Sequence, residues 1–199
     1  GIAEYVGRYD AFASFLAENG IAVVGEDHIG HGRSVAEGAP HIYFSKNDGW
    51  NKVVSDDDTV YILGDMFWCN WKDSLPVLDR LHGRKILVKG NHDRCNESQF
   101  VKKFSKIVDY IEIKDNDRNV VLCHYPIPCY NHHYYGWYHL YGHVHTSFEW
   151  NMMKQVQYEM RNLYDKPSNM FNVGCMVPGM DYTPRTLEEI LAIYGEGDK

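Results

Sequence analysis

Four groups of polar side chains with metal-binding chemistry each follow an apolar run of this 199-residue chain. They are Gly64-Asp65, Gly90-Asn91-His92-Asp93, Cys123-His124 and Gly142-His143-Val144-His145. Imidazole suits Zn, Fe, Ni and Mn alike, and carboxylate and amide oxygens complete many such sites. Each group alone has a structural interpretation, as turn residues or as a core histidine. Their order, each after an apolar run, favours a divalent metal centre.

The residue types within these groups predict different roles. Asp65 offers a carboxylate that can bridge two cations about 3.5–4 Å apart. Asn91 offers a neutral oxygen ligand. The His92 imidazole exchanges a proton near neutral pH, and Asp93 is placed to orient that ring. His92 and Asp93 are therefore the candidate catalytic residues.

Short apolar runs alternate with helical patterns, which favours an α/β protein. A final helix opens at Thr186, which forms a capping box with Glu189. The four polar groups are expected to meet at the carboxyl ends of their strands, the usual rim for sites in α/β proteins. The sequence predicts strands at 21–24, 60–63, 86–88, 107–113, 120–122, 139–141 and 170–173, and helices at 11–18, 50–54, 75–81 and 98–104.

Composition narrows the class of protein. The formal net charge of −7 argues against a broad basic surface for nucleic acid. The five cysteines are odd in number and form no CxxC pair, which indicates free thiols in a reducing compartment. No apolar run approaches a membrane span and no signal peptide is visible. We expect one cytoplasmic domain over residues 1–199, without a membrane partner.

Residues 57–191 resemble the calcineurin-like metallophosphoesterases, whose motifs run D-x-H, G-D, G-N-H-[DE], H and G-H-x-H. The resemblance implies two mixed β-sheets packed as a sandwich flanked by helices, a four-layer α/β fold. It also implies two divalent metal ions (Mn, Fe, Zn or Ni) and a metal-bound water or hydroxide that attacks phosphorus. The implied ligands are Asp65 as the bridge, Asn91, His124 and His143 at one metal, and His145 at the other, while Asn91 and His92 contact the phosphate.

The first motif of that family departs from its pattern here, because no D-x-H precedes Asp65. Residues 1–54 instead resemble the start of a monoacylglycerol lipase of the α/β-hydrolase type, carried by Gly20-Ile21-Ala22-Val23-Val24 and Asp27-His28-Ile29-Gly30-His31-Gly32-Arg33-Ser34. No G-x-S-x-G nucleophile elbow occurs in the chain. One hypothesis is that residues 1–56 replace the first metal block, with 21–24 as its strand and Glu26 and His28 as ligands. Otherwise these are turn residues and one metal site is weak or empty.

The segment 125–141 is rich in aromatic rings and joins two of the metal-binding groups. Its rings, Tyr125 first among them, are candidates for stacking on a nucleotide-like substrate, or they pack on one another or on a second copy. The predicted function is hydrolysis of a small phosphoester, a phosphodiester before others. The alternatives are a relative that binds metal or phosphate without turnover, and a lipase-like esterase, which the missing nucleophile argues against.

Overall fold

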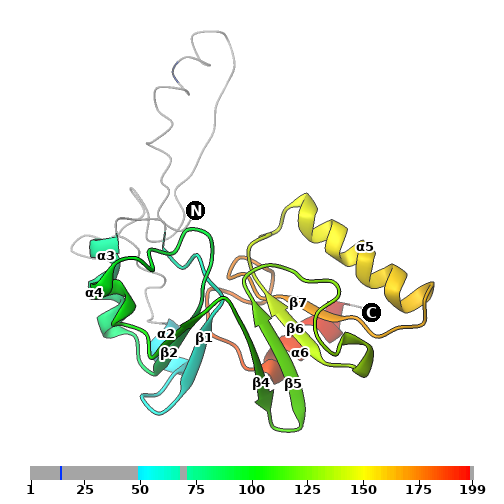
Figure 1. Ribbon diagram of the computed structural model, residues 1–199, viewed down its shortest axis with the longest axis horizontal. Helices are drawn as coiled ribbons and strands as arrows, with labels where there is room; N and C mark the ends of the chain where they lie inside the picture. Colours follow the sequence, from blue (N-terminus) through cyan, green and yellow to red (C-terminus); the bar gives the residue numbers. More distant parts are fainter. Residues whose placement is uncertain (1–13, 15–48, 68–70, 198–199) are drawn as a thin grey trace.

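The computed structural model describes residues 14, 49–67 and 71–197. The expectations for 21–24, Glu26 and His28, and that for 11–18 apart from residue 14, therefore lie outside the described residues. Two sheets carry the described chain (Figure 1). The first holds β1 (Thr59–Ile62), β2 (Arg84–Val88) and β3 (Lys106–Val108), all parallel. The second holds β4 (Tyr110–Asp115), β5 (Arg118–Cys123), β6 (Tyr138–Tyr141) and β7 (Asn169–Asn172).

The second sheet is mixed, since β4 pairs antiparallel with β5 while β5, β6 and β7 run parallel. The burial pattern follows this topology. β4 alternates between exposed and half-buried residues, whereas the last four residues of β5 are all buried. A central parallel strand is covered on both faces and therefore reads as a continuous apolar run. Asn116, with φ 53°, turns the chain between β4 and β5.

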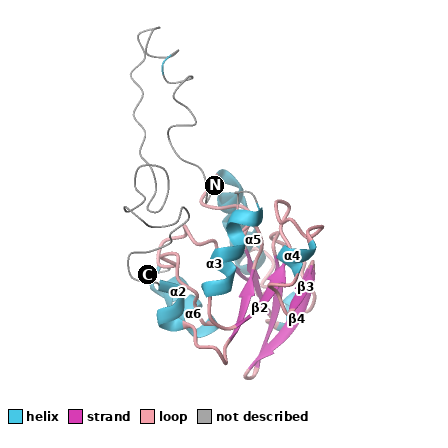
Figure 2. Cartoon of the chain, turned by 90° about the vertical axis from the view of Figure 1, so that its left-hand side faces the viewer, coloured by secondary structure: helices cyan, strands magenta, loops and turns pink. Residues whose placement is uncertain are grey.

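Helices cover these sheets (Figure 2). α3 (Trp71–Arg80) and α4 (Ser98–Val101) lie beside the first sheet, and α5 (Phe148–Asn162) contacts β7 of the second. α6 (Leu187–Gly197) begins at the expected capping box, in which the Thr186 N–H donates to Glu189 Oε2 at 2.8 Å. The short helices are α2 (Gly49–Val53) and the 3₁₀ turn η3 (His133–Tyr135).

Three apolar clusters hold the elements together. One joins the two sheets to α6, through Val88, Leu122 and Ile190 among others. A second lies between the first sheet and α3 and α4, and a third packs the other face of β5 and β6 against residues of α5. Successive residues of β1, and Leu63 which follows it, contact the first two clusters alternately: Tyr61 and Leu63 contact one, Val60 and Ile62 the other. Both faces of β1 therefore contact apolar residues.

The predicted α/β class with two sheets is confirmed, and packing as a four-layer sandwich stays a prediction. Three details of the sequence reading were wrong. The first sheet is parallel among the described strands rather than mixed. The strand expected over 107–113 is two strands in different sheets. The helix α5 was not expected at all. No helix in the described part of the chain has the length and apolar character to cross a membrane.

Candidate metal centre

Two glycines bring the turns after β1 and β2 into direct contact. Gly64, with φ 78°, precedes Asp65 at the end of β1, and a Cβ on it would meet the Gly90 nitrogen at 2.5 Å. A Cβ on Gly90, after β2, would meet Asp65 Oδ1 at 2.2 Å. Neither position has room for a side chain. The glycines therefore allow the turn that carries Asp65 to pack directly against the Gly90-Asn91-His92-Asp93 turn.

A backbone N–H fixes the Asp65 carboxylate in that place. The His92 N–H donates to Asp65 Oδ1 at 2.7 Å. Asp93 completes the link, since its Oδ2 accepts from the Gly90 N–H at 2.8 Å and from the Asp65 N–H at 3.1 Å. These contacts show Asp93 joining the two turns. The expectation that Asp93 orients the His92 ring stays a prediction.

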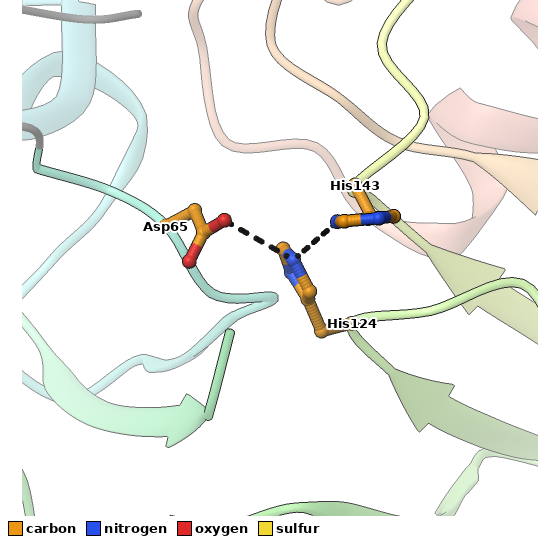
Figure 3. Close-up of side chains that lie close together, drawn as sticks. All are labelled: Asp65, His124 and His143. Atoms are coloured by element: carbon orange, nitrogen blue, oxygen red, sulfur yellow. Dashed lines mark hydrogen bonds and ion pairs between the residues drawn. The ribbon is translucent and has the colours of Figure 1, made fainter. Parts of the chain in front are cut away.

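His124 follows β5 directly and is 2% exposed. Its Nδ1 lies 2.7 Å from the carbonyl oxygen of Leu63, which only accepts, so Nδ1 carries the hydrogen. Nε2 then faces Asp65 Oδ2 at 3.3 Å and His143 Nδ1 at 3.1 Å (Figure 3). It also lies 3.2 Å from Asn91 Oδ1. Four electron-rich atoms from the ends of four strands thus meet at one point.

The charges at this point require a shared cation or proton. Burial opposes ionisation of Asp65, but the hydrogen bonds from His124 and the His92 N–H outweigh it and lower the carboxyl pKa. Burial likewise opposes protonation of His124, but the hydrogen bonds to Asp65 and Leu63 outweigh it and raise the imidazole pKa. Burial and the charge of His124 lower the pKa of His143. A proton on His124 neutralises the charge of the Asp65 carboxylate here, and a metal ion would neutralise it more fully.

The donor atoms fit a divalent transition metal. The ligand atoms of Asp65, His124 and His143 all lie within 4.8 Å of one another. With the Asn91 oxygen they offer two nitrogens and two oxygens, a set that suits Zn, Fe, Ni or Mn. This set is the one that the sequence analysis proposed for the bridge and for one metal. Asn91 and His92 are exposed, so a ligand can reach this side of the cluster.

His145 lies beside this group without belonging to it. His143 and His145 have φ values of 63° and 49°, so the G-H-V-H segment turns sharply after β6. His145 is exposed and lines the same cavity of about 720 Å³ as Asp65, His124 and His143. Glu26 and His28, the other ligands expected for a second metal, lie outside the described residues. Among the described residues, one metal-sized group is formed.

Asn172, at the end of β7, is a site residue that the sequence analysis missed. It is fully buried, and its Nδ2 donates to the His145 carbonyl oxygen at 2.7 Å while its Oδ1 accepts from the Gly174 N–H at 3.0 Å. It therefore ties the turn that carries His143 and His145 to the loop after β7. The sequence signal for this residue is an amide side chain that interrupts the apolar run 170–173, two residues before Gly174.

The aromatic segment after β5 is divided between packing and exposure. The Tyr125 ring is 43% exposed and lies 4.9 Å from His124 and 4.6 Å from His143, centroid to centroid. Tyr130 is buried, with its hydroxyl donating to the Trp137 carbonyl. His139 of β6 holds the segment, since its Nε2 accepts from the Ile127 N–H at 3.0 Å. Tyr125 thus stays a candidate substrate contact.

Comparisons with known proteins bear on separate parts of the chain. The family model of the S33 serine aminopeptidases, α/β-hydrolases, matches residues 1–62. An uncharacterised protein of Methanocaldococcus jannaschii is 33% identical over 100 residues, which are 49% of this chain and 50% of that protein. The gene 66 protein of Mycobacterium phage L5 is 36% identical over 74 residues, 33% of this chain and 36% of that protein. The chain thus spans half or less of the length of these curated relatives.

A crystal structure of a protein of unknown function from Aquifex aeolicus has a similar fold. It superposes with a TM-score of 0.51 and 29% identity, over 72% of this chain and 80% of that protein. Among these names, the name of the family model states an activity. This match, which rests on residues 1–62, indicates a hydrolase in the broad sense. The matched residues include the whole lipase-like segment 1–54 and end with β1.

Proposed function

We propose that this chain is a metal-dependent phosphoesterase of the calcineurin-like type that hydrolyses phosphodiesters. The observation that carries the proposal is the meeting of Asp65, Asn91 and His143 around the Nε2 atom of His124. These residues come from four separate motifs, and each follows its strand in the order of that family's motifs. The two-sheet α/β fold is compatible with the four-layer arrangement that the family implies.

The proposed roles follow from where the side chains lie. Asp65, Asn91, His124 and His143 would hold one divalent ion, and Asp65 would share its carboxylate with a second ion beside His145. Bound divalent metals would supply an activated water nucleophile and neutralise phosphate charge. His124 keeps its Nε2 available because the Leu63 carbonyl holds the hydrogen of Nδ1. The fixed Asp65 carboxylate needs little reorganisation when a cation binds, because two turns already position it.

His92 lies on the exposed side of this cluster. Its N–H binds Asp65, so the imidazole starts from a backbone position fixed beside the proposed metals. An imidazole there can protonate the departing alkoxide or donate a hydrogen bond to a phosphate oxygen. The Asn91 amide is exposed on the same turn, and the Tyr125 ring borders His143. These three residues are the proposed substrate contacts for a small or nucleotide-like phosphoester.

Hydrolysis of a chromogenic phosphodiester with added Mn²⁺, beside a chromogenic acyl ester, tests the proposal. Asp65→Asn keeps the side-chain shape and removes the charge, so we expect at least a hundredfold loss of phosphodiester turnover. Asp117→Asn, at the exposed turn between β4 and β5, is the matched control and should keep wild-type turnover. Turnover of the acyl ester alone would overturn the proposal and favour the lipase-like esterase.

A relative that binds metal without turnover is the second candidate. The observation in its favour is that the described residues form one metal-sized group, whereas the proposed reaction uses two ions. Metal content by elemental analysis, for the wild type and for a Glu26→Ala/His28→Ala variant, separates the two. Two ions falling to one would support the enzyme. One ion in both proteins, with no phosphodiester turnover, would favour the second candidate.

A further inference from the structure

β4 forms one border of the second sheet, and among the described strands it pairs with β5 alone (Figure 1). Its six residues make it longer than the other border strands β1, β3 and β7. Its register with β5 is constant from Tyr110↔Cys123 to Asp115↔Arg118, so it has no bulge, and it contains no proline. Edge strands commonly prevent pairing with another chain by shortness, a bulge, proline or charge. Of these devices, β4 carries charged side chains alone.

The geometry of the hairpin shows which backbone groups of β4 face away from β5. Its loop has two residues, 116 and 117, so Asp115 and Arg118 beside the loop must form a hydrogen-bonded pair. Such pairs alternate along an antiparallel ladder with pairs that exchange no hydrogen bonds. Every second residue of β4 therefore directs its N–H and C=O groups away from β5. These residues, whose side chains are exposed, are Tyr110, Glu112 and Lys114.

The charges along this edge fit a second copy of the same edge. When two β4 strands pair antiparallel about a twofold axis, residues with outward N–H and C=O groups face one another. With the axis at Glu112 or at Lys114, two like charges would meet. With the axis at Ile113, Glu112 of each copy lies opposite Lys114 of the other, which is the favourable cross-strand arrangement. One register is therefore charge-complementary.

The surroundings of Glu112 and Ile113 fit this register. The Tyr110 hydroxyl and the Asn131 amide donate to Glu112 Oε1 at 2.9 Å and 2.8 Å. The hydrogen bond from Asn131, followed by that from Tyr110, lowers the pKa of the Glu112 carboxyl and favours its charged form. On the other face of β4, Ile113 is half-buried and lines the cavity of about 720 Å³, so open space adjoins it. Ile113 of a second copy would lie directly opposite and bury more of both side chains.

We propose that β4 is the contact between two copies of this chain, which pair antiparallel about a twofold axis at Ile113 and join their second sheets into one. The same strand supplies both sides of the contact, so the assembly closes as a dimer. The outward N–H and C=O groups of β4 are then paired in a ladder. This proposal does not depend on the proposed hydrolytic function.

Charge reversal tests the proposal through the dissociation constant of the dimer, measured by sedimentation of the full-length protein with a chelator and a reductant present. Glu112→Lys and Lys114→Glu each set like charges opposite one another at two symmetric places, so we expect each to weaken dimerisation at least tenfold. The double variant restores both pairs with exchanged signs and should return to within about threefold of the wild type. Asp57→Lys, in the exposed turn before β1, is the matched control for charge and should leave the dimer unchanged.

Three outcomes of this experiment would overturn the proposal. A wild type that sediments as a monomer across a hundredfold range of concentration would show that the edge does not pair with itself. A dimer that neither single reversal weakens would lie on another surface. Weakening by both single reversals, without recovery in the double variant, would mean that the two charges do not face one another.

Disulfide formation tests the register with substitutions at the two exposed positions. Residues 112 and 114 of opposite copies form a hydrogen-bonded pair, whose Cα atoms lie about 5.5 Å apart, and a disulfide bridges that separation. Under mild oxidation, we expect a mixture of the Glu112→Cys and Lys114→Cys proteins to form a covalent dimer. Either protein alone should stay at the wild-type background, which is set by the exposed Cys129 and the other native thiols.

A covalent dimer from Glu112→Cys alone, or none from the mixture, would overturn the proposal. Neither the sedimentation nor the disulfide measurement involves metal or turnover, so failure here leaves the proposed phosphoesterase function to its own test.

Discussion

Gly90 is the residue on which the approach of the two turns depends most. The expected Cβ position of Gly90→Ala, 2.2 Å from Asp65 Oδ1, cannot be occupied without moving the carboxylate. We expect this variant to lose metal binding at least tenfold and to unfold at lower urea concentration. Gly195→Ala in α6 is the control, since a Cβ there meets nothing within 4 Å and alanine favours a helix by roughly 0.5–1 kcal/mol. Equal metal affinity in Gly90→Ala and wild type, by calorimetry, would contradict the geometry.

A separate prediction concerns Asn172 and the turn that carries His145. Asn172→Asp keeps an acceptor for the Gly174 N–H but loses the donor to the His145 carbonyl, and it buries a carboxylate. We expect a loss of about 1–3 kcal/mol in the free energy of unfolding, because a buried acceptor is left unpaired. Asn162→Asp, at the exposed end of α5, should change stability by less than about 0.5 kcal/mol. Urea unfolding monitored by tryptophan fluorescence measures both.

The candidate ligands could be predicted from sequence because each follows an apolar strand in a recognisable motif. The supporting contacts could not. The hydrogen bond from His124 to Leu63 joins residues 61 positions apart, and only the fold brings them together. Asp93 shows the limit clearly, since its motif points to a role beside His92 whereas its carboxylate accepts hydrogen bonds from the backbone of Gly90 and Asp65. Residue type predicts chemistry better than it predicts partners.

At the scale of elements, β6 carries a pH-dependent contribution to stability through His139. Burial lowers the pKa of this imidazole to about 4, from 6.5, while Nε2 accepts from the Ile127 N–H. The unfolded chain therefore binds a proton first as pH falls. The contribution is complete above pH 6.5 and is lost progressively toward pH 4, by about 3 kcal/mol in total.

We expect the free energy of urea unfolding, measured with a chelator, to fall more steeply between pH 7 and pH 4.5 in the wild type than in His139→Gln. The other titrating groups remain in both proteins, so the difference between the two slopes isolates His139. Parallel slopes would show that His139 does not titrate differently on folding.

Strands were predicted better than helices here, for physical reasons. A buried strand can be recognised in the sequence as an apolar run, as in Val120-Val121-Leu122 of β5. α5 has no fully buried residue and exposes Phe148 and Met152, so its sequence shows no clean apolar face. The expected strand over 107–113 concealed a change of sheet, because apolar residues continue through both β3 and β4. Periodicity does not report which neighbour a strand pairs with.

For the molecule as a whole, a metal ion held by this cluster would link the two sheets. Asp65 and Asn91 follow strands of the first sheet, and His124 and His143 follow strands of the second. Binding to the folded state alone, at a hundred times the dissociation constant, stabilises by about 2.7 kcal/mol. We expect Mn²⁺ added to chelator-treated protein to raise Tm by roughly 5–10 °C. Thermal unfolding of Asp65→Asn should not respond, and an equal rise in that variant would place the ion elsewhere.

The passage of the chain from one sheet to the other is very short. β3 ends at Val108 and β4 begins at Tyr110, so Asp109 alone separates strands of different sheets. The Lys89 side chain forms an ion pair with Asp109, and the Lys89 backbone N–H donates to the Val108 carbonyl at 2.7 Å. These contacts anchor the segment between β3 and β4 to the end of β2. A joint this short, tied at both ends, limits how far the two sheets can move apart. We therefore expect the distance between the Asp65 turn and the His143 turn to be set largely at folding.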